Sequence, residues 1–228
     1  MSTSPVSPAV DQAAAASVLK PDFAAQRKHF IFTDEHEQLR ESIRRFAKKE
    51  LAPHAEEWEE ITFPDWVFTR MGALGFLGLD KPEAYGGQGG DYYSSLVLAE
   101  EIAHAESGGL AMGIAVHTDM AMPPIFAFGT EEQKQQWAAP AIRGEKILCL
   151  GITEPDAGSD VAGIKTRAVL DEASGEWVIN GSKTYITNGH RADVIVLVTK
   201  TDPDAGYAGF TLFLVPMDAP GVIREKRL

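Results

Sequence analysis

Residues 152–166, "ITEPDAGSDVAGIKT", decide how the rest of this chain is interpreted. An apolar run at residues 146–152 comes just before this stretch, which therefore leaves the end of a predicted strand. Glycine-rich loops in this position often bind phosphate with free backbone N–H groups. Here, however, the carboxylates of Glu154, Asp156 and Asp160 would repel a phosphate that faced them. The loop is therefore predicted to hold an uncharged polar group.

An uncharged planar ring with carbonyl edges fits this loop. The backbone N–H groups and the hydroxyl of Thr153 can donate hydrogen bonds to such an edge. Glu154 and Asp160 can brace the loop by accepting its own N–H groups, as acidic side chains do in turns. A flavin is thus favoured over a nucleotide triphosphate, but the spacing of the residues does not name the ring.

A second motif, "WVINGSKTYITNG", follows at residues 177–189. Asn180-Gly181 separates two apolar runs and predicts a tight hairpin, because both turn positions need a positive φ. Alternation along the second strand then places Tyr185 and Thr187 on one face. An aromatic ring and a hydroxyl group on that face could cover and hydrogen-bond a flat ligand. A half-exposed strand of ordinary β-formers is the simpler interpretation of this segment when it is taken alone.

Upstream of the loop, residues 32–143 show the apolar periodicity of helices. Thr33 is predicted to cap the first helix, and a second helix is predicted over residues 65–74. The stretch 82–91, "PEAYGGQGGD", is a predicted break because its glycines disfavour a helix. The apolar stretch 110–128 predicts a helix buried on several sides, with two adjacent prolines that kink or divide it. Together these segments predict a bundle of about five or six helices.

Downstream of residue 145 the pattern changes to short apolar runs separated by turns, which is typical of strands. No long helical segments alternate with these runs, so the sheet is predicted to be mostly antiparallel, as a barrel or a sandwich. The predicted fold class is α+β, a helical bundle followed by this β domain. The predicted organisation is a flexible tail (1–28), a helical domain (29–145) and a middle β domain (146–228) that lacks its last strands.

The composition restricts the class of protein. A formal net charge of −12 over 228 residues argues against a nucleic-acid partner, which would need a basic face. No stretch approaches the roughly 20 apolar residues of a membrane-spanning helix. The first 28 residues lack the basic start and the apolar centre of a secretory signal, which favours a cytoplasmic protein. Cys149 is the single cysteine, so no internal disulfide is expected, and its apolar neighbours favour a buried structural thiol.

Two motifs carry a resemblance to a known family. The stretches "GITEPDAGSDVAGIKT" (151–166) and "WVINGSKTYITNG" (177–189) resemble the acyl-CoA dehydrogenase family in their order and separation. Upstream, "HFIFTDEHEQLRESIRRFAKKELAPHAEEWE" and "YGGQGGDYYSSLVLAEEIAHA" look like the first helices and the glycine loop of its long-chain-type branch. The resemblance covers residues 29–228. It implies that a helical N-terminal domain and a β-rich middle domain together bind FAD.

The resemblance also implies contacts for individual residues. The positions that match the family's flavin-binding residues are Leu150, Gly151, Ile152, Thr153, Gly158, Ser159, Tyr185, Ile186 and Thr187. Thr153 is expected to bond the edge of the flavin ring. Tyr185 is expected to cover one face of the ring in place of the commoner Trp, and Thr187 to reach the edge near N5. Ser159 and, on a weaker match, Thr201 are expected to contact the acyl-CoA substrate.

The reaction that the resemblance implies is the α,β-dehydrogenation of an acyl-CoA thioester with hydride transfer to flavin N5, as in fatty-acid β-oxidation. An electron-transfer flavoprotein is the expected electron acceptor, and a homo-oligomer is the expected assembly. The family's base is a glutamate on a C-terminal helical domain, and this chain is expected to stop before that domain. No catalytic residue is therefore assigned, and the isolated chain is expected to be inactive. Glu100, Glu101 and Glu154 are expected to have surface or loop-bracing roles, and no histidine spacing suggests a metal site or a triad.

Several alternatives stay open. Lys183, Arg191 and Lys200 could offset the charge of coenzyme A, or they could be solvated charges at strand ends. An acyl-CoA oxidase or a flavin monooxygenase of the same superfamily would use the same residues but let oxygen reach the reduced ring. A non-catalytic module that binds flavin or acyl-CoA would explain the missing base.

Overall fold

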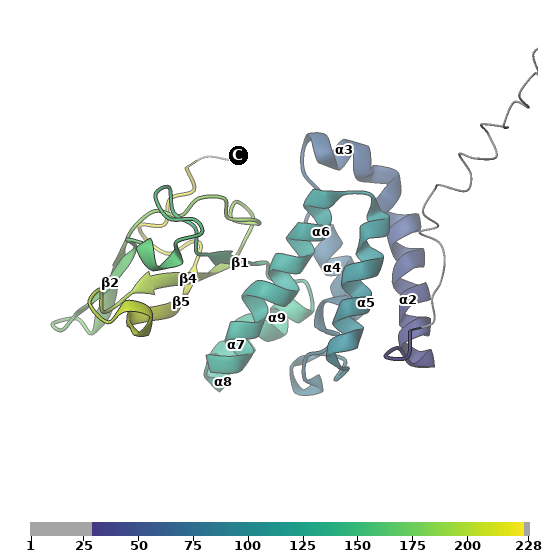
Figure 1. Cartoon of the computed structure of the whole chain (residues 1–228), viewed down its shortest axis with the longest axis horizontal. Coiled ribbons are helices and arrows are strands. Elements are labelled where there is room, and N and C mark those ends of the chain that lie inside the picture. The colour runs from purple at the N-terminus through teal and green to yellow at the C-terminus, as the bar shows by residue number, and fades with distance from the viewer. Residues whose placement is uncertain (1–28, 226–228) are drawn as a thin grey trace, which may run out of the picture.

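The computed structural model describes residues 29–225, so the predicted tail at residues 1–28 lies outside the described residues. Helices occupy the chain from Asp34 to Ile142, and strands follow from Leu148. Figure 1 shows the helices gathered on one side and the sheet on the other, with β1 beside the helices and β2 farthest from them. This order of a helical region and a sheet region confirms the predicted α+β class.

The first helix, α2, begins where the sequence predicts it. The hydroxyl of Thr33 accepts the backbone N–H of His36, and the His36 ring accepts the N–H of Thr33, which completes a capping box. The α-helices are α2 (Asp34–Phe46), α3 (Ala55–Glu60), α4 (Trp66–Ala73), α5 (Tyr92–Ile102), α6 (Gly108–Ala115), α7 (Met122–Phe128), α8 (Glu131–Gln133) and α9 (Ala139–Ile142). Turns of π-helix continue α2 as η1 (Ala47–Leu51), join α6 to α7 as η6 (Val116–Ala121), and join α8 to α9 as η7 (Lys134–Ala138).

The apolar helix predicted at residues 110–128 runs from Gly108 to Phe128 as α6, η6 and α7. Pro123 and Pro124 do not divide it, because they follow the π-helical turn at the start of α7, where proline is tolerated. Within the described part of the chain, this is the helix that is long and apolar enough to cross a membrane by length and composition alone. Of its apolar window 50% is buried inside the structure, as is also found in core helices of globular domains.

The two largest apolar clusters lie within the helical region and between the helices and the sheet. The first lies within the helical region and includes the fully buried side chains Ile43, Phe68, Met71 and Leu110. The second joins the helices to the sheet, and its members include Met122, Ile125, Trp137, Leu148, Val194 and Val196. Burying a large apolar side chain stabilises the folded state by about 1.5–3 kcal/mol. The second cluster therefore fixes the sheet against the helices.

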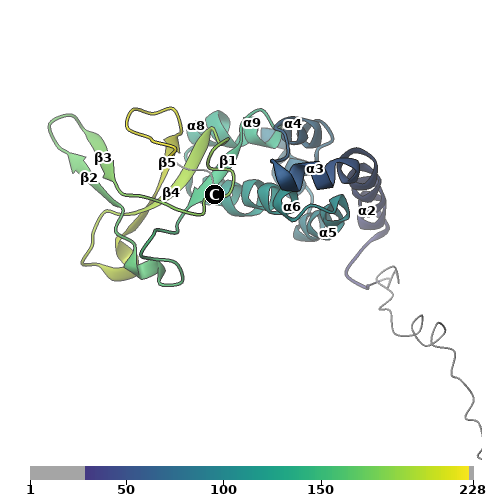
Figure 2. The same ribbon diagram turned by 90° about the horizontal axis from the view of Figure 1, so that it is seen from above.

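Among the described residues, five strands form one sheet: β1 (Leu148–Gly151), β2 (Arg167–Asp171), β3 (Glu176–Asn180), β4 (Val194–Lys200) and β5 (Phe210–Pro216). Strand β4 pairs in parallel with β1, in antiparallel with β5, and at Lys200 with β2. Strands β2 and β3 form an antiparallel hairpin, which Figure 2 shows at the end of the sheet farthest from the helices. The sequence predicts a mostly antiparallel barrel or sandwich. The long pairings of β2 with β3 and of β4 with β5 are antiparallel, as predicted, but β4 pairs in parallel with β1 and the sheet is not closed.

The parallel pairing of β1 with β4 accounts for this difference. The connection between the two strands returns the chain to the start of β1, where the Asp193 N–H donates to the carbonyl of Ile147 (2.8 Å). The Asp193 carboxylate in turn accepts the N–H of Ile147 (2.7 Å). β4 then runs beside β1 in the same direction, beginning with the pair Leu148–Val194. Apolar runs do not distinguish the two directions, because the same side chains are buried in both.

The hairpin predicted at Asn180-Gly181 is wrong. Asn180 is the last residue of β3 and pairs with Arg167, whereas the hairpin turns at residues 172–175. Position 181 requires a glycine for another reason, since a Cβ there would lie 2.2 Å from Oγ1 of Thr166. This glycine permits close packing and does not form a turn.

The alternation predicted after that turn is also wrong. Residues 181–189 form no strand, and Tyr185 and Asn188 have left-handed φ angles of 56° and 66°. Side chains of an irregular segment do not alternate between two faces, so Tyr185 and Thr187 do not share a pleat. The position of this segment is set instead by hydrogen bonds from Lys183 and Thr184 to the loop after β1.

Candidate functional site

The loop after β1 is folded back on itself. Glu154 and Ala157 exchange two backbone hydrogen bonds, of 2.9 and 3.1 Å, with Pro155 and Asp156 at the tip of the turn. Gly158 follows on the surface, and a Cβ on it would meet no atom within 4 Å. The backbone is therefore open to a ligand at this point of the loop.

Glu154 points into the protein and away from the surface of the loop. Its buried carboxylate accepts the N–H groups of Lys165 (2.6 Å) and Thr166 (2.9 Å). It also accepts the Thr166 hydroxyl and the ammonium group of Lys183 (2.8 Å). Burial raises the pKa of this carboxyl, but the hydrogen bonds outweigh burial and lower the pKa to about 2. The prediction that Glu154 braces the loop by accepting its N–H groups is confirmed.

The segment after β3 is fastened to this loop. Thr184 donates its backbone N–H to the carbonyl of Thr153 (2.9 Å), and Lys183 Nζ donates to the carbonyl of Ile152 (2.9 Å). These bonds bring the two sequence motifs side by side. The Lys183 side chain is only 7% exposed. Both sequence interpretations of Lys183 are therefore wrong: it is neither a free cation for coenzyme A nor a solvated strand end.

Several hydroxyl groups of the two motifs are available to a ligand, among them those of Thr153, Ser159 and Thr187. Within residues 29–225, the side chains of Thr153, Ser159 and Thr187 form no hydrogen bond to another protein group. Tyr185, two residues before Thr187, is 77% exposed. Its left-handed backbone is uncommon for an aromatic residue and persists only where the surroundings fix it. An exposed aromatic ring and free hydroxyl groups on two joined segments are suited to a planar polar ligand.

The other predicted flavin residues contact the scaffold. Leu150 packs in the cluster that joins the sheet to the helices. Gly151 lies close to β4, since a Cβ on it would be 2.6 Å from Cδ1 of Ile195. Ile186 packs against the same cluster as Ile195, and Ile152 packs in a separate small cluster of the sheet. These residues place the backbone of the two motifs on the sheet.

Within the described residues, three of the side chains considered for coenzyme A, unlike Ser159, have protein partners. The hydroxyl of Thr201 is hydrogen-bonded to that of Thr211 (2.8 Å), which links the end of β4 to β5. Lys200 Nζ donates to the carbonyl of Ala162 (2.7 Å), and Arg191 is bound to the helical region. The structure therefore does not present Lys200 or Arg191 as unoccupied cations.

Sequence reasoning does not identify the histidine that links the helices to the sheet. His117 in η6 is fully buried; its Nε2–H donates to the carbonyl of Ala141 (3.0 Å), and its Nδ1 accepts the N–H of Leu148 (3.1 Å). These two bonds assign the neutral tautomer with the proton on Nε2. Burial lowers the pKa of His117 to about 4. No local signal identifies this role, because the partners lie 24 and 31 residues away.

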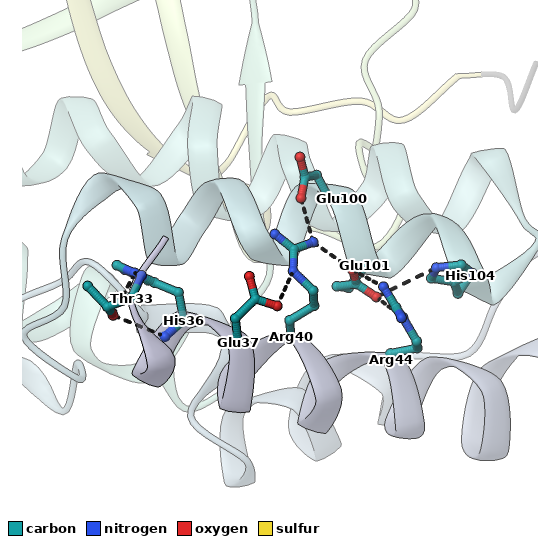
Figure 3. Close-up of polar contacts among 8 residues, drawn as sticks. All are labelled: Thr33, His36, Glu37, Arg40, Arg44, Glu100, Glu101 and His104. Atoms are coloured by element: carbon teal, nitrogen blue, oxygen red, sulfur yellow. Dashed lines mark hydrogen bonds and ion pairs between the residues drawn. The ribbon is translucent and has the colours of Figure 1, made fainter. Parts of the chain in front are cut away.

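The two glutamates of the helical region that were candidates for the catalytic base are paired with arginines. Figure 3 shows Glu101 of α5 facing Arg40 and Arg44 of α2. Arg44 donates two hydrogen bonds to it (2.6 and 2.8 Å) and Arg40 donates one (2.8 Å), while Glu100 pairs with Arg40. Burial raises the pKa of Glu101, but these arginine bonds outweigh burial and lower it. Both glutamates join α2 to α5. The predicted surface or loop-bracing role is wrong for Glu101, which is buried between the two helices.

A metal centre needs several His, Cys, Asp or Glu side chains that lie close together. In the part of the chain that the structure describes, no group of three or more such side chains could hold a metal ion.

Family models match both halves of the chain. The model described as "Acyl-CoA dehydrogenase, N-terminal domain" matches residues 33–145. The model described as "Acyl-CoA dehydrogenase, middle domain" matches residues 149–228. The two matched ranges contain the helical region and the sheet region, respectively.

Individual proteins show the same similarity. The chain is 38% identical over 203 residues to the mitochondrial long-chain specific acyl-CoA dehydrogenase of Sus scrofa, a match that covers 87% of this chain and 46% of that protein. The crystal structure of an acyl-CoA dehydrogenase from Geobacillus kaustophilus has a TM-score of 0.78 at 41% identity, and covers 83% of this chain and 50% of that one. An acyl-CoA dehydrogenase from Bacillus anthracis complexed with FAD has a TM-score of 0.77 at 36% identity, with coverages of 83% and 32%. The chain thus spans about half the length of the curated relatives it matches.

Proposed function

This chain belongs to the acyl-CoA dehydrogenase family, and from that premise we propose that it forms the FAD-binding part of an acyl-CoA dehydrogenase. The observation that carries the proposal is the junction of the two motifs. The Thr184–Thr153 hydrogen bond and the Lys183–Glu154 ion pair hold them together. A structural relative complexed with FAD supports the choice of cofactor.

The residues present fit an uncharged ring with polar edges. Glu154 faces inward and Asp156 pairs with Lys165 (2.9 Å), so neither carboxylate opposes a ligand at the junction. The free hydroxyl groups of Thr153 and Thr187 would hold the edges of the FAD ring. The exposed ring of Tyr185 would cover one of its faces. Leu150, Gly151, Ile152, Gly158 and Ile186 would support the ring through the backbone of the same segments.

The proposed reaction forms a double bond between the α and β carbons of an acyl-CoA thioester. A base removes the α-proton while the β-hydrogen leaves as a hydride. FAD, when bound, supplies the acceptor for that hydride. This chain would orient the ring and the thioester toward one another, with Ser159 and Thr201 on the acyl-CoA side. A hydroxyl donor such as that of Thr187 stabilises negative charge that develops at a ring edge.

We place the base outside these 228 residues. Glu101 and Glu154 are buried in ion pairs, and Glu100 is bound by Arg40. Despite burial, the ion pairs and hydrogen bonds of Glu101 and Glu154 lower their pKa values, which makes these two carboxylates poor proton acceptors. A glutamate elsewhere in the full-length protein is the proposed base, and the activity is proposed for that protein.

The remaining assignments follow from family membership and are proposals too. The substrate is an acyl-CoA of fatty-acid β-oxidation, the electron acceptor is an electron-transfer flavoprotein, and the full-length protein is a homo-oligomer. The division into domains at residues 29–145 and 146–228 is part of the same proposal. A cytoplasmic location stays a prediction, since the similar proteins include enzymes named mitochondrial as well as bacterial ones.

Anaerobic mixing of the FAD-loaded full-length protein with an acyl-CoA tests the proposal. We expect the yellow absorbance to bleach, and to return when an electron-transfer flavoprotein is added. Rapid peroxide formation in air would favour an oxidase or a monooxygenase instead. Binding of the acyl-CoA without bleaching would contradict dehydrogenase activity and favour a non-catalytic module.

A further inference from the structure

The segment that carries Tyr185 and Thr187 ends in a residue that fastens it to both halves of the structure. The side-chain amide of Asn188 donates to the carbonyl of Gly113 in α6 (2.8 Å) and to that of Leu148 in β1 (3.4 Å). These acceptors lie 75 and 40 residues away in the sequence, so the contact depends on the tertiary fold.

The residue type at this position is narrowly defined. Asn188 has a left-handed φ of 66°, which asparagine adopts more readily than most residues. Its amide nitrogen faces two carbonyl oxygens, so the position needs a donor and not an acceptor. Gly113 completes the fit, because a Cβ on it would lie 3.2 Å from Oδ1 of Asn188 and 2.6 Å from the Phe63 ring.

A second side chain holds the same turn against the helical region. Arg191 donates to the hydroxyl of Thr62, and its guanidinium nitrogen lies 3.1 Å from the carboxylate of Asp65. The guanidinium group also lies 4.4 Å from the centre of the Phe63 ring. The N–H of Arg191 donates to the carbonyl of Asn188 (2.9 Å), which makes the two contacts parts of one turn. Both sequence interpretations of Arg191 are therefore wrong, since it is engaged with the helical region.

From this geometry we infer that Asn188 is a positioning residue for the flavin contacts. Its amide fixes the backbone that follows Thr187 to α6 and β1, so the helical region sets how Tyr185 and Thr187 are presented to the ring. Asn188 acts through these neighbours and takes no part in the chemistry. The inference rests on the proposed function, because it assumes that this segment contacts FAD.

Two substitutions in the full-length protein test the inference. Asn188→Gly keeps a residue that adopts the left-handed backbone but removes the amide. Loss of its two hydrogen bonds is expected to weaken FAD binding roughly tenfold. Asn188→Asp has the same shape but puts an acceptor against two carbonyl oxygens, and we expect a larger loss of affinity. In both variants the visible circular dichroism of bound flavin is expected to change, because it depends on the surroundings of the ring.

A matched control separates this role from a loss of stability. Thr69→Val removes a comparable side-chain bond, from Oγ1 to the carbonyl of Gly144 (3.3 Å), within the helical region. It is expected to lower Tm without changing the affinity for FAD or the flavin spectrum. If Asn188→Gly behaves like this control while the wild type binds FAD, the inference is overturned and the proposed function stands.

Two further outcomes are also decisive. If the wild-type full-length protein binds no FAD, the proposed function fails and the inference fails with it. If Asn188→Gly does not fold, Arg191→Lys loosens the same turn and is measured instead with the same two readouts. A changed flavin spectrum and weaker binding support the inference, and unchanged values overturn it.

Discussion

The ammonium group of Lys183 and the carboxylate of Glu154 lie 2.8 Å apart, although 29 residues separate them in the sequence. Their side chains are only 7% and 5% exposed. The pair holds the segment after β3 against the loop after β1, which is the arrangement that the proposed flavin site requires. Because both charges are buried, removing one of them leaves the other without its counter-charge.

Lys183→Met is expected to lower the free energy of unfolding by about 3 kcal/mol, because a buried carboxylate loses its cation. Denaturant unfolding measures this loss. Lys165→Met is the matched control, since it removes an ion pair to Asp156 of nearly the same length (2.9 Å) whose side chains are 74% and 73% exposed. The control should change stability very little. Equal losses in the two variants would refute the role assigned to Lys183.

Neutral, buried His117 predicts a loss of stability on the acid side of neutrality. Burial lowers its pKa from 6.5 to about 4, so the unfolded chain binds the proton first as the pH falls. The contribution of neutral His117 to the free energy of unfolding is therefore complete above about pH 6.5. It declines by about 3 kcal/mol as the pH falls to about 4. Unfolding at a series of pH values measures the decline. His117→Gln offers a donor and an acceptor without titrating, and a profile as steep as that of the wild type would contradict the prediction.

The low pKa of Glu154 predicts a second loss of folding stability at lower pH. Burial raises its pKa, but its hydrogen bonds lower it further, from 4.5 to about 2, so the folded state favours the ionised carboxylate. Its contribution is present above about pH 4.5 and is lost as the pH falls toward 2, by about 3 kcal/mol in total. Glu154→Gln should be less stable than the wild type at neutral pH and should approach it near pH 2. A difference that stays constant over this range would argue against the assigned bonds.

Glu101→Gln is expected to lower the free energy of unfolding by about 3 kcal/mol, because two arginines lose a buried partner. Glu100→Gln is the matched control on the same helix, and its side chain is 46% exposed. We expect a much smaller loss for the control. Neither change should alter the flavin spectrum, since neither residue belongs to the two motifs. An altered spectrum in Glu101→Gln would instead connect this ion pair to the site.

Local sequence signals predict those elements whose causes are local. The capping residue Thr33 begins α2 as predicted, and the apolar run predicted just before Asn180-Gly181 coincides with β3 (Glu176–Asn180). Strand β2 (Arg167–Asp171) is missed, because one of its side chains is buried and the others are exposed, which gives no clear alternation. The direction of β1 relative to β4 is missed because it depends on how a long connection returns, which apolar runs do not record.

At the candidate site, too, contacts between residues that are distant in the sequence are not predicted from local sequence signals. Asn180-Gly181 has the composition of a hairpin turn, but Gly181 is required by its close approach to Thr166, which directly precedes the paired strand β2. The bracing of the loop by Glu154 is predicted, because acidic side chains commonly accept N–H groups of their own loop. Its pairing with Lys183 is not predicted, because the strand predicted after Asn180-Gly181 does not form. The resemblance implies that the two motifs lie close together, and the tertiary contacts explain why they do.

Amide hydrogen exchange of the full-length protein, with and without FAD, tests the central claim most directly. The account predicts that FAD slows exchange chiefly at residues 150–159 and 185–187, the two segments that Lys183 and Thr184 hold together. Slowed exchange elsewhere, with both segments unchanged, would contradict it.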